Sequence, residues 1–203
     1  MSELTAAEVR LANQRQNDTS KTVFGFWVYL MTDCVLFAGL FATYAVLHNN
    51  TFGGPDGKEL FSLPYVLAET MILLLSSYSC GLAILAVKRN AKKAALWLFF
   101  LTFCLGLAFL AMELIEFHKL IEEGNNWQRS GFLSSYFTLV GTHGLHITVG
   151  LIWIAVMIMK VSKMGLNEVN TKRLTLMSLF WHFLDVIWIF IFTIVYLLGA
   201  LQI

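Results

Sequence analysis

Two pairs of ionisable residues lie inside long apolar segments and have the spacing needed to act together. His143 and His146 are three residues apart, and so are His182 and Asp185. Residues with this spacing lie on one face of an α-helix. Each pair, and also Asp33, lies roughly 15 Å from an end of its segment at ~1.5 Å per residue. The sequence therefore predicts a polar belt at the middle of these segments.

A second set of ionisable residues, Glu69, Glu113 and Glu116, lies nearer to the segment ends. A charged side chain at the centre of a bilayer costs about 2.5–3.5 kcal/mol on insertion scales. Such residues imply internal pairing, protonation to the neutral form, or a function. The candidate buried polar network, or set of lipid contacts, comprises Glu69, Glu113, Glu116, His143, His146, Trp181, His182 and Asp185.

Three interpretations of the belt remain open from spacing alone. The H-x-x-H and H-x-x-D pairs could supply four metal ligands from two helices, although they lack the E-x-x-H motif of di-metal bundles. The belt could instead carry protons or ions, as in a secondary transporter. The third interpretation is hydrogen bonding between helices or contact with lipid head groups. A Ser/His/Asp triad and a phosphate-binding glycine loop are both missing from the pattern.

The elements that must position these residues are membrane-spanning helices. The chain has 203 residues, of which 58% are hydrophobic and 13% charged, and its mean hydropathy is +0.69. Soluble domains carry about a quarter charged residues. We predict an all-α membrane protein with a five-transmembrane-helix bundle. Residues 23–203 form this bundle as a single domain, and residues 1–22 form a loosely ordered polar tail before it. The five apolar blocks, each exceeding the ~20 residues that span a bilayer, are about 23–47, 66–87, 94–117, 132–159 and 174–200.

The distribution of Lys and Arg predicts the orientation of these helices. Eleven of the 14 lie in the tail and in the two loops on its side, and three lie in the loops on the opposite side. The side with more Lys and Arg is normally cytoplasmic. We therefore expect a cytoplasmic N-terminus and a periplasmic C-terminus. The net charge of +1 gives no indication of nucleic-acid binding.

Four segments together resemble a known family. "GFLSSYFTLVGTHGLHITVG" and "LFWHFLDVIWIFIFTIVYLLGA" resemble two helices of subunit III of haem–copper oxidases, with their G-x-H-G-L-H and W-H-F-x-D-x-x-W motifs. "LAFLAMELIEFHKL" resembles the helix before them, and "FGFWVYLMTDCVLFAGLFATYA" resembles the helix that carries a mid-membrane carboxylate. The resemblance covers essentially everything after residue 22. Many members have seven helices, and a version with five is typical of bacterial bo-type ubiquinol oxidases.

The resemblance implies an accessory, non-catalytic subunit of a proton-pumping quinol oxidase, in the bacterial inner membrane. This chain would bind no cofactor or metal, because haems and copper belong to subunit I and ubiquinol is the substrate of the complex. It would contact subunit I directly, alongside subunits II and IV, hold phospholipid, and support proton uptake or oxygen entry. Asp33 is the candidate functional carboxylate. The alternatives are subunit III of a cytochrome c oxidase, or a small metalloenzyme that uses His143, His146, His182 and Asp185.

Overall fold

A computed structural model describes residues 6–51, 53 and 62–201, and every regular element within these ranges is a helix. Five helices are long and apolar enough to cross a membrane, which confirms the predicted all-α class with five spans. The elements are α1 (Ala6–Leu47), α3 (Leu63–Lys88), α4 (Lys92–Glu122), α5 (Gly131–Met164), α6 (Glu168–Ile191), the π-helix η1 (Phe192–Leu197) and α7 (Leu198–Leu201).

The helices extend beyond the apolar blocks that predict them. α5 ends at Met164, although its apolar block ends near residue 159, because the polar residues that follow still favour a helix. The N-terminal tail differs from its expectation in the same way, since α1 begins at Ala6. Ala, Glu, Arg, Leu and Gln dominate its first turns, and all are strong helix formers. Most of the loop predicted between the first two spans lies outside the described residues.

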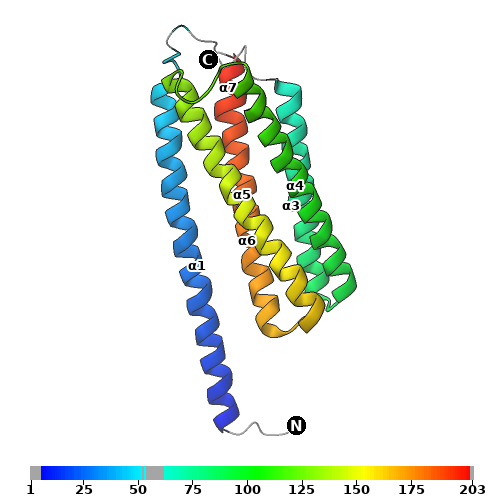
Figure 1. The fold of residues 1–203 in the computed structure, drawn as a ribbon. Coiled ribbons are helices and arrows are strands. Elements are labelled where there is room, and N and C mark those ends of the chain that lie inside the picture. The colour runs from blue at the N-terminus through cyan, green and yellow to red at the C-terminus, as the bar shows by residue number, and fades with distance from the viewer. Residues whose placement is uncertain (1–5, 52, 54–61, 202–203) are drawn as a thin grey trace. The chain divides into compact units, whose positions relative to one another are not determined.

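The chain forms two compact units, Met1–Leu36 and Phe37–Ile203. In the second unit, α3, α4, α5 and α6 form a ring in which each helix packs against the next and α6 packs against α3. Figure 1 shows these four helices running lengthwise beside one another. The last part of α1 belongs to this unit. There, the Tyr44 hydroxyl donates to the Val195 carbonyl over 3.4 Å, and the Phe41 ring packs edge-on against Phe190.

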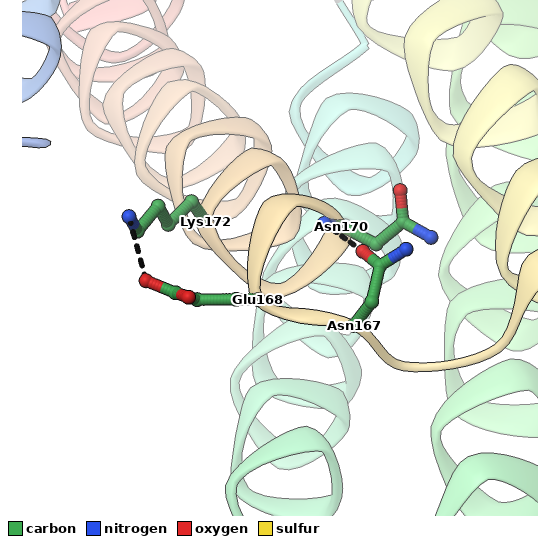
Figure 2. A network of polar contacts seen from close by, with 4 residues as sticks. All are labelled: Asn167, Glu168, Asn170 and Lys172. Carbon is green, nitrogen blue, oxygen red and sulfur yellow. Dashed lines mark hydrogen bonds and ion pairs between the residues drawn. The ribbon is translucent and has the colours of Figure 1, made fainter. Parts of the chain in front are cut away.

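Two short connections fix the order of the ring. α3 and α4 are joined by residues 89–91, so they run antiparallel side by side. Gly165 follows the last residue of α5 and caps it, and its φ of 75° favours glycine. Asn167 then caps α6, and its side-chain oxygen accepts a hydrogen bond from the Asn170 backbone N–H over 2.7 Å (Figure 2). Glu168 and Lys172 pair over 3.0 Å along the first turn of α6 (Figure 2).

Candidate functional site

Three carboxyl groups from α3 and α4 gather inside the ring. Glu69 and Glu113 are 0% and 2% exposed, and Glu116 is half-buried. Each of the three interacts electrostatically with the other two. Among the described residues, both oxygens of Glu69 and both oxygens of Glu113 lack a hydrogen-bond partner. We call Glu69, Glu113 and Glu116 the carboxyl cluster; they are the residues that the sequence analysis places in its second set.

The carboxyl of Glu113 lies directly against the backbone of α5 at Gly144. A Cβ atom on Gly144 would lie 2.7 Å from Oε1 of Glu113 and 3.1 Å from its carboxyl carbon. Only a glycine therefore leaves room for the carboxyl at this crossing of α4 and α5. Small residues on a membrane helix usually admit the side chains of an apolar neighbour. Here the group that Gly144 admits is a carboxyl.

A pair of tyrosines connects the carboxyl cluster to α5 and η1. The Tyr196 hydroxyl donates to Oε2 of Glu116 over 3.0 Å and lies 2.9 Å from the Tyr136 hydroxyl. Both tyrosine side chains are fully buried. Tyr196 lies in the π-helix η1, a kind of element that occurs frequently at functional sites. Neither tyrosine is predictable from the sequence, because a tyrosine in an apolar block has no distinguishing spacing.

His143 lies in the aromatic core of the ring and is 0% exposed. Its Nε2–H donates to the Leu184 carbonyl on α6 over 3.2 Å. The ring contacts Trp188 at 5.1 Å between centroids, and Phe109 packs edge-on against it at 5.9 Å. Nδ1 has no partner among the described residues. His143 is therefore a packing and hydrogen-bonding residue that ties α5 to α6.

Trp181 occupies a slot between glycines of α4 and α5. A Cβ atom on Gly106 would lie 2.7 Å from its ring, and one on Gly150 would lie 3.0 Å away. The indole Nε1–H donates to the Ser76 hydroxyl on α3 over 3.1 Å. The indole of Trp188 likewise donates to Thr70, also on α3. The two tryptophans thus hold α6 against α3 by hydrogen bonds as well as by packing.

His182 and Asp185 meet the Ser77 hydroxyl of α3, and we call these three residues the polar seam. Nδ1 of His182 lies 2.6 Å from the Ser77 hydroxyl, and Asp185 interacts electrostatically with His182. Oδ1 of Asp185 is buried and has no partner among the described residues.

The predicted belt does not converge on one point. His143 bonds α6, His182 bonds α3, and Nδ1–H of His146 donates to the Thr142 carbonyl of its own helix over 2.8 Å. Among the described residues, no three His, Cys, Asp or Glu side chains are grouped closely enough to hold a metal ion. The geometry thus gives no support to the four-ligand metal site. Asp33 lies in the first unit, where it hydrogen-bonds the Tyr29 hydroxyl one turn away.

The serines of α3 are partners that the sequence analysis missed. Ser76, Ser77 and Ser79 lie within an otherwise apolar span and are all buried. Polar residues clustered at this spacing in a transmembrane segment are a usable signal for an interface between helices. Ser79 also bonds Thr102 of α4 over 2.7 Å. Two of these serines therefore join α3 to its neighbours, Ser77 to α6 and Ser79 to α4.

Comparison with known proteins gives consistent matches over nearly the whole chain. The family model of cytochrome c oxidase subunit III matches residues 7–200. Cytochrome bo(3) ubiquinol oxidase subunit 3 of Pseudomonas aeruginosa is 58% identical over 180 residues, 89% of this chain and 86% of that protein. The protein of the same name from Buchnera aphidicola subsp. Baizongia pistaciae is 47% identical over 90% of this chain and 94% of its own length. Cytochrome c oxidase subunit 3 of Bacillus sp. (strain PS3) is 47% identical over 86% of this chain and 84% of its own length.

Proposed function

Because the chain belongs to the family of cytochrome c oxidase subunit III, we propose that it is the third subunit of a bacterial bo3-type ubiquinol oxidase. The identity of 58% with such a subunit over 89% of the chain carries this proposal. The function is that of a multi-pass membrane subunit in a complex that oxidises quinol and reduces oxygen. The second candidate is subunit 3 of a cytochrome c oxidase, which one relative at 47% identity favours.

The proposed role of this chain within the complex is accessory. The histidines that resemble metal ligands in sequence instead make contacts within and between helices, as His143 does with Leu184 and His182 with Ser77. These contacts support a chain that stabilises its complex and leaves haem and copper chemistry to subunit I. Subunit I is the direct partner, with subunits II and IV in the same assembly.

The membrane environment proposed for the chain is the bacterial inner membrane, with bound phospholipid. The excess of Lys and Arg on one side supports a cytoplasmic N-terminus and a periplasmic C-terminus. This orientation places Lys88 and Lys92, at the α3–α4 connection, on the cytoplasmic side. The carboxyl cluster then lies in the periplasmic half of the second unit.

Asp33 is the proposed functional carboxylate. The first span begins at Ser20, and Asp33 lies about 20 Å along the helix from that end. A carboxylate at such depth needs a hydrogen-bond donor or a role in moving protons. The Tyr29 hydroxyl supplies one donor. The proposed role is support of proton uptake or of sustained turnover by the complex.

The deciding experiment is purification of the tagged chain in mild detergent with its partners. We expect haem and copper in the whole complex and none in this chain after dissociation. The complex should oxidise ubiquinol and leave reduced cytochrome c unchanged. Oxidation of cytochrome c would favour the second candidate. Metal at about one equivalent in the dissociated chain, or failure to co-purify with any oxidase subunit, would contradict an accessory oxidase subunit.

A further inference from the structure

The carboxyl cluster lies inside the second unit, among α3, α4 and α5. Glu69 and Glu113 belong to membrane-spanning helices, and both side chains are buried. The backbone of α5 covers Glu113 at Gly144, where a Cβ atom would lie 2.7 Å from Oε1 of the carboxyl. The contacts that surround the cluster all come from Phe37–Ile203, so its environment is that of one compact unit.

The three carboxyls differ in the hydrogen bonds that reach their oxygens. Oε2 of Glu116 accepts from the Tyr196 hydroxyl over 3.0 Å, and the Tyr136 hydroxyl lies 2.9 Å from that of Tyr196. A hydroxyl carries one hydrogen, so Tyr136 must donate to Tyr196. This chain of two donors ends on Glu116. In contrast, both oxygens of Glu69 and both oxygens of Glu113 have no partner among the described residues.

Positive charge is distributed about the cluster in the same uneven way. Lys119 lies on α4 one turn beyond Glu116 and interacts with it electrostatically. The Lys119 side chain is 74% exposed and pairs with Glu123 over 3.9 Å. Within the described part of the chain, no Lys, Arg or His forms an ion pair with Glu69 or Glu113. Glu116 therefore has the surroundings of a carboxylate, and the other two carboxyls do not.

The other titratable neighbours supply no counter-charge to the buried pair. Tyr65 of α3 interacts electrostatically with Glu69, and its hydroxyl donates to a backbone carbonyl of α4 over 3.0 Å. His143 of α5 donates to a backbone carbonyl of α6, and its electrostatic partner is His146. If Glu69 and Glu113 were ionised, they would be two like charges that had lost their hydration without compensation.

Protons on the buried carboxyls would supply the missing hydrogen-bond donors. A carboxylate only accepts hydrogen bonds, so two carboxylates cannot bond to each other. A protonated carboxyl carries an O–H and can donate to the oxygen of a neighbouring carboxyl. Each member of the cluster interacts electrostatically with the other two. Protonation of two members would therefore also remove the repulsion between three like charges.

We propose that the carboxyl cluster is a proton-binding site, in which Glu69 and Glu113 hold protons at neutral pH and Glu116 carries the charge. The ligand of this site is the proton itself. One proton adds to one carboxylate oxygen and gives a neutral carboxylic acid. The bound proton lets Glu113 lie against the backbone of α5, and its loss places a charge at that crossing. The inference does not depend on the proposed function, because every residue that carries it lies inside the second unit.

Infrared spectroscopy of the chain, purified with the partners that it retains, tests the site directly. The carbonyl stretch of a carboxylic acid is separate from the carboxylate bands. At neutral pH, we expect the difference spectrum between wild type and Glu113→Gln to show the loss of a carboxylic acid band. Glu122→Gln is the matched control, since Glu122 lies on the same helix with a side chain that is 68% exposed, and it should lose a carboxylate band. Loss of a carboxylate band from Glu113→Gln would overturn the proposal.

The pH dependence of stability is the second test. Glutamates of the unfolded chain are ionised at neutral pH, whereas the folded chain holds protons on Glu69 and Glu113. Raising the pH therefore favours unfolding. We expect the apparent Tm for release of this subunit to fall as the pH is raised above neutral. Glu113→Gln should reduce that fall by about half, because one of the two protonated carboxyls is replaced by an amide that keeps its hydrogens. An equal fall in wild type and variant would contradict the site.

The assembly of the variants is itself informative. The side chain of Gln has nearly the shape of a neutral carboxylic acid, so Glu113→Gln and Glu69→Gln should both assemble. If Glu113→Gln does not assemble, both measurements are made on Glu69→Gln. Failure of both variants would show that a neutral side chain cannot replace these carboxyls, and it would overturn the proposal. Whether the wild-type chain co-purifies with an oxidase is a separate result, which bears only on the proposed function.

Discussion

At the scale of single residues, several buried N–H and O–H donors of the second unit are hydrogen-bonded, whereas buried carboxyl oxygens lack donors. Trp181, Trp188 and Tyr196 all donate to side chains on other helices. The carboxyl oxygens of Glu69 and Glu113 have no donor among the described residues. The cause lies in the hydroxyl groups nearby, which donate to carbonyls of their own helix, as Thr70 does to Val66.

Gly144→Ala tests the contact between α5 and Glu113. The added methyl would lie 2.7 Å from Oε1 of Glu113, so a carboxyl or a helix must move. We expect a loss of about 1–3 kcal/mol in the free energy of unfolding. The measurement is the apparent Tm for release of this subunit from the purified complex.

Gly81→Ala is the matched control, because nothing lies within 4 Å of a Cβ built on Gly81 in α3. There the change should be neutral or stabilising by about 0.5–1 kcal/mol, since Ala favours a helix more than Gly does. Shortening the neighbour, in Gly144→Ala with Glu113→Ala, should recover part of the loss. Equal Tm values for the Gly144 and Gly81 variants would contradict the close contact.

Tyr196→Phe tests the link between η1 and the carboxyl cluster. The substitution removes a hydroxyl that donates to Glu116 and bonds Tyr136, so the buried Tyr136 hydroxyl and the half-buried Glu116 carboxyl each lose a partner. We expect a loss of about 1–3 kcal/mol in the free energy of unfolding. The measurement is the apparent Tm for thermal dissociation of the complex. Tyr78→Phe, at a side chain that is 68% exposed, should change the same Tm little.

At the scale of elements, the π-helix η1 changes which face of the last span carries the side chains that follow it. α6 runs regularly to Ile191, and the six residues of η1 then follow with wider turns before α7. A π-turn accommodates one residue more than an α-turn, so it changes the face on which later side chains lie. Trp188 before the change and Tyr196 within it both point into the ring.

Deletion of Thr193 tests this account of η1. Thr193 is exposed, and its hydroxyl donates to the Ile189 carbonyl of its own helix. Loss of one residue inside a π-helix lets the chain return to α-helical turns, so the packing of Trp188 should survive. We expect the subunit still to assemble, measured as its amount in the purified complex. Deletion of Val186 within α6 should abolish assembly, and equal effects of the two deletions would contradict the argument.

At the scale of the whole molecule, the helices were predictable and their rotations were not. Length and hydropathy determine five spans, because each must satisfy its backbone hydrogen bonds internally. Spacing places His182 and Asp185 on one face. It could not identify Ser77 as the partner of His182, because the rotation of α3 follows from packing. For the same reason, spacing predicts a single polar belt, whereas in the structure His143 lies in the aromatic core and His182 lies in the polar seam.

Asp33→Asn belongs to the same scale, because its expected effect is on the activity of the assembled complex. The variant replaces the carboxyl with a neutral amide and keeps the shape of the side chain. We expect an unchanged haem spectrum, with activity that declines several-fold faster during continuous turnover. The measurement is oxygen consumption over time by the purified complex. Tyr29→Phe, which removes the donor to Asp33, should also make the activity decline faster. A changed haem spectrum in Asp33→Asn would contradict an accessory role.

The short connection between α3 and α4 has a consequence for biosynthesis. At ~1.5 Å per residue, Glu69 lies roughly 29 Å along α3 from Lys88, and Glu113 lies roughly 32 Å along α4 from Lys92. The two carboxyls therefore reach nearly the same depth from the connection. A single helix entering the bilayer alone would expose its carboxyl to lipid. Entering as a hairpin, the two helices would let these carboxyls face each other before α5 covers Glu113 at Gly144. The pair is thus a unit of insertion as well as of packing, and either helix alone should be retained poorly in the bilayer.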